Sequence, residues 1–402
     1  MWAVEAVELL PRDRRFKVHM RNRASVWKRQ TNGLPQGSVL APTLFNLYTN
    51  DLPPIQSRKF IYADDICLGH QAKTFDELES ALNADMAKMA EYCSRWRLQP
   101  SVTKTVSSVF HLNNFSASKE LSVYLNGQRL KHDPHPVYLG VMMDRSLTFH
   151  DHTKKTAAKV RTRNNLLNKL AGSIWGANTK TLRSSALSLC YSTAEYCAPV
   201  WCRSSHSKLV DVELNSTMRT ITGTLRPTPL PWLSVLSNIA PPHLRREEAT
   251  ASMVEKIRVN PSLPLYQDMF QPPRARLTSR HPVWLSLLNQ KPSVTEAWQE
   301  EWTNSDAINQ FLIVNATARV PGSDLPRRLW SLLNRFRTGQ GLCAANLHLW
   351  GLRADPLCEC GLRQSMTHIV EDCHLTRLQG GLRALHSADE AAVVWLDKTS
   401  KR

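Results

Sequence analysis

The chain has 402 residues, and 51 lysines and arginines against 34 acids give it a formal net charge of +17, which favours a polyanionic partner and above all nucleic acid. Its hydrophobic fraction of 42% excludes a generally disordered chain, and the lack of a long apolar run or a signal peptide argues against a membrane-spanning or secreted protein. Nine cysteines, an odd number, are atypical of a secreted disulfide framework, so we expect an intracellular protein with buried or metal-bound thiols.

The first segment combines the end of a helix with two half-exposed strands. The helix at residues 2–10 is predicted to stop at Pro11. Polar and apolar residues alternate over 15–20, and a second strand-like run follows at 25–30. Asp13 lies in a turn rich in arginine, where we expect it to pair with an arginine side chain.

A glycine-rich loop comes next and opens into a helix. Gly33 and Gly37 flank Pro35 and Gln36, so the backbone here can approach a ligand closely. Apolar residues at helical spacing predict a helix within 40–48. Taken alone, the loop fits a plain connector as well as a binding loop.

Two adjacent carboxylates, Asp64 and Asp65, lie within the apolar, strand-like run 60–68. Two acids inside a sheet are costly unless a cation compensates their charge, and oxygen ligands of this kind suit Mg²⁺. The alternative is a tight turn in which both acids only face water, and an isolated pair favours that alternative. The glycine loop upstream shifts the balance towards a metal site.

The next elements are a helix and several short strands. Thr74 and Glu77 have the spacing of a capping box and open a helix predicted over 74–98, whose apolar face we interpret as core packing. A hairpin is predicted at 121–128 and a further strand at 137–144.

Residues 149–172 predict a basic amphipathic helix, which is either a solvated face or a surface for phosphates. A more apolar helix follows at 181–200. We interpret the three cysteines near it, Cys190, Cys197 and Cys202, as buried thiols rather than metal ligands. Between 227 and 326 proline is frequent, which predicts short helices separated by loops and shows no catalytic constellation.

A second chemical signal lies near the C-terminus. Cys358, Cys360, His368 and Cys373 are four ligands of the type that binds Zn²⁺ tetrahedrally. The single residue between the first two cysteines is a tighter spacing than usual. His374 is a rival to His368, and unrelated thiols are the plain alternative.

In this order, the motifs resemble those of non-LTR (LINE-type, jockey-like) retrotransposon reverse transcriptases. The resemblance rests on Gly33-Leu34-Pro35-Gln36-Gly37, Tyr62-Ala63-Asp64-Asp65, the segment around Lys104, Tyr138-Leu139-Gly140, and Arg337-Thr338-Gly339 ahead of the cysteines. It implies an α+β fold: a partial polymerase palm of antiparallel sheet and helices (1–150), a helical thumb-like region (151–225), a Pro-rich helical connection (226–335), a CCHC zinc-knuckle region (336–390) and a tail (391–402).

The resemblance also implies roles for individual residues. Asp64 and Asp65 would be catalytic ligands of Mg²⁺ or Mn²⁺, and Lys104 a general acid for the leaving pyrophosphate, although a solvent-facing lysine fits Lys104 equally well. Residues implied to contact template, nucleotide or primer are Gly33, Pro35, Gln36, Gly37, Tyr62, Tyr138, Leu139 and Gly140. The implied partners are an RNA template, a DNA primer or target and deoxynucleotide triphosphates, in the nucleus or in a cytoplasmic ribonucleoprotein.

The implied activity is RNA-directed DNA polymerisation. In the family a further Asp ends a strand well upstream of the glycine loop, and Asp13 is a poor substitute for it. We therefore expect a chain truncated at its N-terminus and inactive in isolation. The alternative is a catalytically dead, nucleic-acid-binding remnant that uses the basic helix and the zinc knuckle, and a relative of intron maturases is less favoured.

Overall fold

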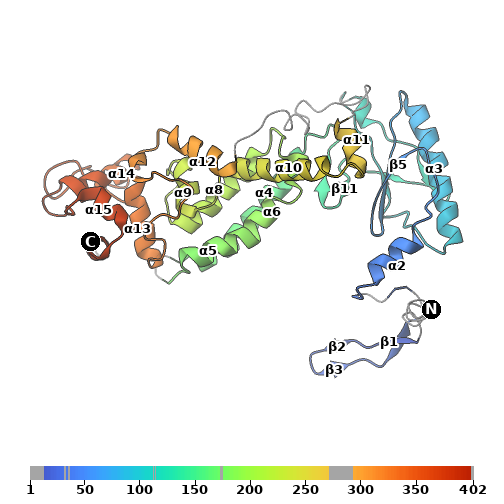
Figure 1. Cartoon of the computed structure of the whole chain (residues 1–402), viewed down its shortest axis with the longest axis horizontal. Helices are drawn as coiled ribbons and strands as arrows, with labels where there is room; N and C mark the ends of the chain where they lie inside the picture. Colours follow the sequence, from blue (N-terminus) through green and yellow to red (C-terminus); the bar gives the residue numbers. More distant parts are fainter. Residues whose placement is uncertain are drawn as a thin grey trace. The chain divides into compact units, whose positions relative to one another are not determined.

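The computed structural model describes residues 13–30, 33–34, 37–111, 113, 115–172, 175–270 and 293–399. The chain divides into two compact units, Met1–Tyr138 and Leu139–Arg402 (Figure 1). Helices and two-stranded sheets together give a mixed α+β architecture. Among the described residues, no helix is long and apolar enough to cross a membrane.

The first unit contains short paired strands. Antiparallel pairs are formed by β1 (Arg14–Phe16) with β4 (Lys28–Gln30), β2 (His19–Met20) with β3 (Arg23–Ala24), β5 (Arg58–Tyr62) with β6 (Asp65–Gly69), and β8 (Tyr124–Leu125) with β9 (Gln128–Arg129). A parallel pair joins β7 (Val106–Ser107) to β10 (Lys131–His132), and β11 (Val137–Tyr138) ends the unit. Asp13 forms exposed ion pairs with Arg15 and Arg29, which confirms the arginine pairing predicted for it.

Three helical segments accompany these strands: α2 (Ala41–Tyr48), α3 (Phe75–Arg95) and the short 3₁₀ turn η1 (Ser116–Ser118). The predicted capping box begins α3. The Thr74 side chain accepts a hydrogen bond from the Glu77 backbone N–H, and the Glu77 side chain accepts one from the Thr74 backbone N–H. The apolar face of α3 packs on a small core built from the later strands and loops, as predicted. The core residues are Val109, Leu121, Val123, Leu125 and Leu130.

A buried acid attaches the strand β5 to α3. Asp85 of α3 is fully buried and accepts hydrogen bonds from the backbone N–H groups of Gln56 (3.0 Å) and Ser57 (2.8 Å). Burial alone would raise the pKa of Asp85, but the hydrogen bonds from Ser57 and Gln56 outweigh it and lower that pKa. Since Ser57 directly precedes β5, this ionised carboxylate fixes the start of the β5–β6 hairpin on the helix.

The second unit begins with β12 (Val141–Met142) and is otherwise helical. Its first bundle comprises α4 (His150–Leu170), α5 (Thr179–Ala186), the π-helical turn η2 (Leu187–Tyr191), α6 (Ser192–Ala194), α7 (Ala198–Trp201) and α8 (Lys208–Thr222). Trp201, Val160 and Leu214 lie in its core. The helices α4 and α8 run parallel, because Asn164 bonds to the Glu213 carbonyl (2.9 Å) and, one turn further on, Asn168 accepts from Thr220 (2.7 Å).

The remaining elements are the short helices that the prolines predicted, followed by a C-terminal helical region. They are α9 (Leu230–Ser237), α10 (Pro242–Arg258), α11 (Pro264–Phe270), α12 (Val294–Thr303), η4 (Gln310–Leu312), α13 (Arg327–Arg337), α14 (Ala344–Leu349), η5 (His368–Asp372), α15 (Gly381–Ser387) and α16 (Glu390–Thr399). Proline stands at the N-terminus of several of them, where its missing N–H costs nothing. Trp232 and Trp330 are completely buried in the core between them.

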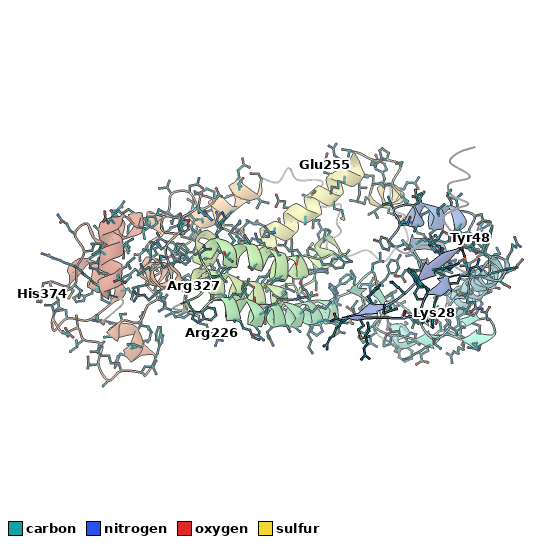
Figure 2. All side chains as sticks on the ribbon, turned by 90° about the horizontal axis from the view of Figure 1, so that it is seen from below. Lys28, Tyr48, Arg226, Glu255, Arg327 and His374 are labelled. Atoms are coloured by element: carbon teal, nitrogen blue, oxygen red, sulfur yellow. The ribbon has the colours of Figure 1, made fainter. Side chains whose placement is uncertain are left out.

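Polar side chains of α13 donate hydrogen bonds to the last carbonyls of α8. Arg327, labelled in Figure 2, donates to the carbonyls of Thr220 and Ile221, and Asn334 donates to the Thr222 carbonyl (2.9 Å). The last carbonyls of a helix have no partner within it, so α13 supplies the partners that α8 lacks. This ties the first bundle to the C-terminal region.

Candidate functional site

The two adjacent carboxylates lie at the tip of the β5–β6 hairpin. Tyr62 pairs with Asp65 across the ladder, so Ala63 and Asp64 form the two-residue turn between the strands. Opposed residues of an antiparallel pair share a face, which places Asp65 on the same face as Tyr62. Both acids are exposed, and neither forms an ion pair or hydrogen bond within the described part of the chain.

This exposure differs from the sheet interior that the apolar run predicted. In the described residues β5 and β6 pair only with each other, so no third strand joins the hairpin. Phe60 and Tyr62 are accordingly 43% and 65% exposed. The local geometry is the tight turn that we had considered as the alternative, and two uncompensated carboxylates stand together at its tip.

The turn is strained at Ala63. Its φ of +52° lies in the left-handed region, which non-glycine residues enter at a cost of roughly 1 kcal/mol or more. Two-residue hairpin turns normally use Gly, Asn or Asp at such positions. Strain of this kind is common at functional sites, and here it fixes the direction in which the Asp64 and Asp65 backbone leaves the turn.

Tyr138 is the sequence-predicted residue that the structure brings to this hairpin. Its side chain is half-buried. Its pKa is raised first by burial and then by the nearby charges of Cys67 and Asp65. The charges of Cys67 and Asp65 on β6 therefore reach Tyr138, although these residues are far apart in sequence.

The residues that follow Tyr138 form a tight turn in the second unit. Leu139 and Gly140 both have positive φ, +46° and +78°. The Tyr196 hydroxyl donates to the Leu139 carbonyl (2.9 Å), and a Cβ on Gly140 would stand 3.2 Å from the Tyr196 ring. Glycine is thus the residue that fits here, and Tyr196 is a contact that sequence reasoning missed.

The other predicted residues of the first unit are exposed or only partly described. Gly33 and Gly37 have φ of +80° and +86° with open space where a Cβ would lie. Pro35 and Gln36 lie outside the described residues. Lys104 is exposed in a turn closed by its backbone N–H bonding to the Ser101 carbonyl (3.2 Å).

The basic helix predicted over 149–172 corresponds to α4, and its cations are exposed: Lys154, Lys155, Lys159, Arg161, Arg163 and Lys169. Within the described residues only Arg161 among them forms an ion pair, to Glu213 of α8 (2.6 Å). The opposite face of α4 is buried in the bundle core. The remaining five cations are free to contact an anionic ligand.

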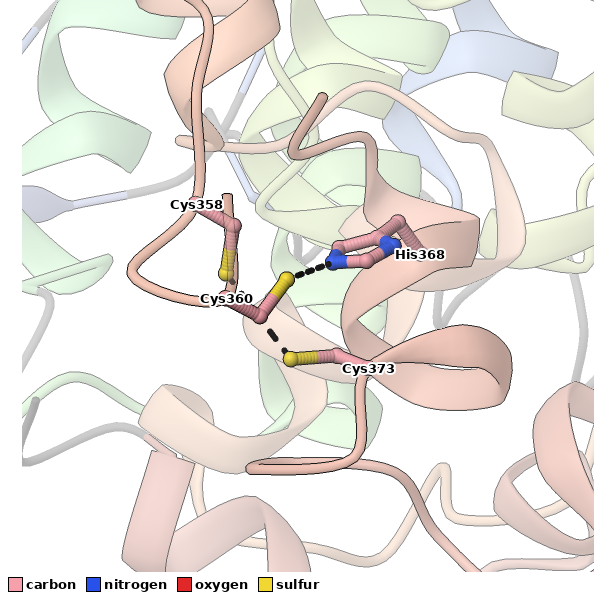
Figure 3. Close-up of side chains that lie close together, drawn as sticks. All are labelled: Cys358, Cys360, His368 and Cys373. Atoms are coloured by element: carbon pink, nitrogen blue, oxygen red, sulfur yellow. Dashed lines mark hydrogen bonds between the residues drawn. The ribbon is translucent and has the colours of Figure 1, made fainter. Parts of the chain in front are cut away.

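The four predicted metal ligands converge near the C-terminus. Figure 3 shows Cys358, Cys360, His368 and Cys373 facing one another, and their ligand atoms lie within 4.8 Å of one another. Cys358 Sγ and Cys373 Sγ are 3.8 Å apart, and Cys360 Sγ lies 3.2 Å from His368 Nε2. Sulfur atoms at two corners of a tetrahedron around Zn²⁺ are separated by roughly 3.8 Å. His374, the rival to His368, is exposed and is not part of the cluster.

Local backbone geometry explains this convergence. The first two cysteines lie in a tight loop closed by a β-bridge between Leu357 and Arg363, with Gly361 at a φ of +86°. The other two ligands begin and follow the π-helical turn η5, in which the Cys373 N–H bonds to the His368 carbonyl five residues back (2.8 Å). A π turn is wider than an α turn and is frequent at functional sites.

Groups around Cys373 favour its thiolate form. Gln364 Nε2 donates to Cys358 Sγ (3.5 Å), a contact that the cysteine spacing did not predict. Burial raises the pKa of Cys373, but hydrogen bonds from Thr376 and the Leu375 backbone outweigh it and lower that pKa to about 6. The donor set and its spacing fit a metal ion.

Comparison with known proteins finds a family match in the N-terminal part of the chain. The family model for reverse transcriptase (RNA-dependent DNA polymerase) matches residues 3–143. Residues 3–143 are thus similar to reverse transcriptases. The matched region includes the glycine loop, the Asp64–Asp65 hairpin, Lys104 and Tyr138-Leu139-Gly140, so the predicted resemblance is confirmed.

The curated relatives of this chain carry the names of polymerases from mobile elements. The probable RNA-directed DNA polymerase from transposon BS of Drosophila melanogaster is 31% identical over 224 residues, covering 52% of this chain and 24% of that protein. The polymerase from mobile element jockey of Drosophila funebris is 32% identical over 148 residues, or 34% of this chain and 16% of that protein. The chain therefore spans about a quarter or less of these curated relatives.

Some relatives match most of the chain, and so extend over both units. The Pol polyprotein from type-1 retrotransposable element R1 2 of Nasonia vitripennis is 24% identical over 366 residues, which is 85% of this chain and 85% of that protein. No solved structure matches the chain.

Proposed function

We propose that the first unit contributes to RNA-directed DNA polymerisation: template-primed addition of deoxynucleotides by a two-metal mechanism. The observation that supports this most is the exposed, uncompensated Asp64–Asp65 pair at a strained hairpin tip within a reverse transcriptase region. Tyr138, which lies by Asp65, would help to hold the primer end at the same place.

The carboxylates of Asp64 and Asp65 would hold Mg²⁺ or Mn²⁺. Mg²⁺ is commonly held by one or two carboxylates together with substrate phosphates, so two exposed acids fit this ion. When bound, the metals stabilise the attacking and leaving oxygens of the transfer. In the described residues no third acid, Cys or His converges on this pair, so we infer that the chain alone has only weak polymerase activity.

The other predicted residues would position substrates. The open backbone at Gly33 and Gly37 leaves room for template and nucleotide, with Tyr62 and the Leu139-Gly140 turn as further contacts. Lys104, which is exposed, would protonate the leaving pyrophosphate. We place the protein with RNA template and DNA primer in the nucleus or in a ribonucleoprotein.

A primer-extension assay tests this function. The full chain, with Mg²⁺ or Mn²⁺, a primed RNA template and deoxynucleotides, is compared with Asp64→Asn and with Asp76→Asn, an exposed acid of α3 outside the hairpin. Extension by the wild type and Asp76→Asn, lost in Asp64→Asn, supports the proposal. Extension that survives Asp64→Asn contradicts it.

A second candidate is nucleic-acid binding without catalysis, and the exposed cations of α4 favour it. They would form a thumb-like surface within residues 151–225 that contacts phosphates without reading sequence. Tight, salt-dependent binding of the primed template without any extension supports this candidate over the first. Binding that is insensitive to salt contradicts it.

We also propose that Cys358, Cys360, His368 and Cys373 bind one Zn²⁺ ion in a knuckle that stabilises the region around residues 336–390. Metal analysis of the purified chain tests this. One zinc per chain is expected for the wild type and for Cys197→Ser, which changes a half-buried cysteine of the bundle. Cys360→Ser, at the most accessible ligand thiol, is expected to lose the zinc. Equal zinc content in all three contradicts the proposal.

A further inference from the structure

Arginines from three segments gather around the C-terminal end of α8. Arg219 lies in the last turn of the helix, Arg226 lies in the loop that follows, and Arg335 comes from α13. Arg335 is placed there by a long hydrogen bond from its Nε to the carbonyl of Gly223 (3.4 Å), the residue that caps α8. Figure 2 labels Arg226.

The end of the basic helix α4 reaches the same place. Thr220, beside Arg219, donates a hydrogen bond to Asn168 of α4 (2.7 Å). Lys169, the next residue of α4, is exposed. Because α4 and α8 run parallel, the arginines adjoin the C-terminal end of the basic face of α4.

These charges lack compensation. Within the described residues the side chains of Arg219 and Arg226 form no ion pair or hydrogen bond, and the Nε of Arg219 is buried without a partner. Buried polar atoms in native proteins nearly always have partners, so an unpaired one calls for an explanation. Burial, and next the charge of Arg226, lower the pKa of Arg219, as expected for a guanidinium without a counter-charge.

Attraction to the helix dipole does not explain this arrangement. Cations near a helix C-terminus are normally favoured by its free carbonyls. Here Arg327 and Asn334 already bond to the carbonyls of Thr220, Ile221 and Thr222. Arg219 therefore keeps its positive charge while the acceptors beside it are occupied.

We propose that Arg219, Arg226 and Arg335 bind backbone phosphates of a nucleic acid strand that continues along the basic face of α4. Guanidinium groups suit phosphate because they offer several N–H donors in a plane. This inference rests on the proposed nucleic-acid function and adds to it a site outside both the hairpin and the cysteine cluster. The contacts would be independent of base sequence.

Salt dependence of binding tests the site. Affinity of the full chain for a fluorescein-labelled RNA template annealed to a DNA primer is measured by anisotropy at several salt concentrations. Log affinity falls as log salt concentration rises, and each lost phosphate contact makes this fall shallower by roughly 0.7 to 0.9 in slope. Arg219→Gln/Arg226→Gln is therefore expected to lower the slope by about 1.5, and the exposed single change Arg226→Gln by about half as much.

The control is Lys256→Gln/Lys398→Gln, which removes the same charge from exposed positions of α10 and α16. A slope that falls in the arginine variants but not in the control supports the site. Equal slopes in the arginine variants and the wild type overturn the site and leave the proposed function standing. Absence of binding by the wild type overturns both.

Discussion

The unit that ends at Tyr138 carries the exposed Asp64–Asp65 hairpin, whereas the unit that begins at Leu139 is built around fully buried aromatic side chains. The largest fully buried side chains of the described residues include Trp201 and Trp330 of the second unit, and only Leu121 represents the first. The first unit thus carries its two adjacent carboxylates on a short, exposed hairpin. The second holds its cations and cysteines on a dense helical core.

The difference shows two ways of positioning functional groups. In the first unit local backbone features place them: the turn at Ala63, and Asp85, which anchors the start of β5. In the second unit, contacts between distant segments place them: Asn334 of α13, for example, donates a hydrogen bond to a carbonyl at the end of α8. Substitutions of the same type are therefore expected to have different consequences in the two units.

The largest contrast is expected from truncating aromatic side chains. Trp201 is fully buried in the α4–α8 core, so Trp201→Ala is expected to lower the free energy of unfolding by about 3–5 kcal/mol. Phe60 of β5 is 43% exposed, so Phe60→Ala is expected to cost less than about 1 kcal/mol. Urea unfolding of the full chain, followed by tryptophan fluorescence and by circular dichroism, measures both. Equal losses would contradict the contrast.

Between pH 7.5 and pH 5, a loss of stability is expected from His386 of the second unit. Burial first, and then the charge of Arg337, lower the pKa of His386 to about 4, and its Nδ1 accepts a hydrogen bond from Arg337 (3.0 Å). Because the pKa of His386 in the folded chain lies below the ordinary 6.5, neutral His386 stabilises the fold. This contribution to stability is complete above pH 6.5 and is lost as the pH falls towards 4. His386→Gln is expected to reduce the difference in urea midpoint between pH 7.5 and pH 5. An unchanged difference would contradict this.

A smaller effect is expected around the cysteine cluster. Gln364 donates to Cys358 Sγ, and loss of a contact next to a metal ligand typically weakens metal binding by about 10- to 100-fold. Gln364→Ala is therefore expected to weaken Zn²⁺ affinity by that factor in competition with a coloured chelator. His374→Ala, at an exposed position outside the cluster, serves as the control and should retain full affinity. A loss of affinity in the control would place the site elsewhere.

The smallest predicted effect is shared by both units. Thr74 and Ser293 each begin a capping box, at α3 and α12 respectively. Replacement of either by alanine is expected to cost about 1 kcal/mol, because helix capping is local and does not depend on the surrounding core. Thermal unfolding of the two single variants measures this. A cost confined to one unit would show that capping there is coupled to tertiary packing.

Sequence predicted the features that depend on neighbouring residues. The capping box at Thr74, the proline-started helices and the cysteine spacing are local patterns, and the structure contains each of them. Features that depend on distant segments were not predicted. Asp85 is buried because Gln56 and Ser57 bond to it, and nothing in the α3 sequence marks it as an anchor.

The same limit explains the error at the hairpin. The apolar run 60–68 predicted a covered strand, because β-favouring residues usually pack between layers. In the described residues no third strand joins β5 and β6. Phe60, Ile61, Tyr62 and Ile66 are exposed, whereas Cys67 and Leu68 are half-buried. Arg337 is the opposite case: within the Arg-Thr-Gly segment it had no predicted structural role, yet it is fully buried and donates to the carbonyl of Pro321 (2.7 Å).

The central claim is that Asp64 and Asp65 hold a divalent cation for nucleotide transfer. It is tested most directly by adding Mn²⁺ and a deoxynucleotide triphosphate to the ¹⁵N-labelled chain and following paramagnetic broadening of its amide signals. The account predicts that broadening centres on the turn between β5 and β6 and is greatly reduced in Asp64→Asn but not in Asp76→Asn. Broadening centred elsewhere, or unchanged in Asp64→Asn, would contradict the account.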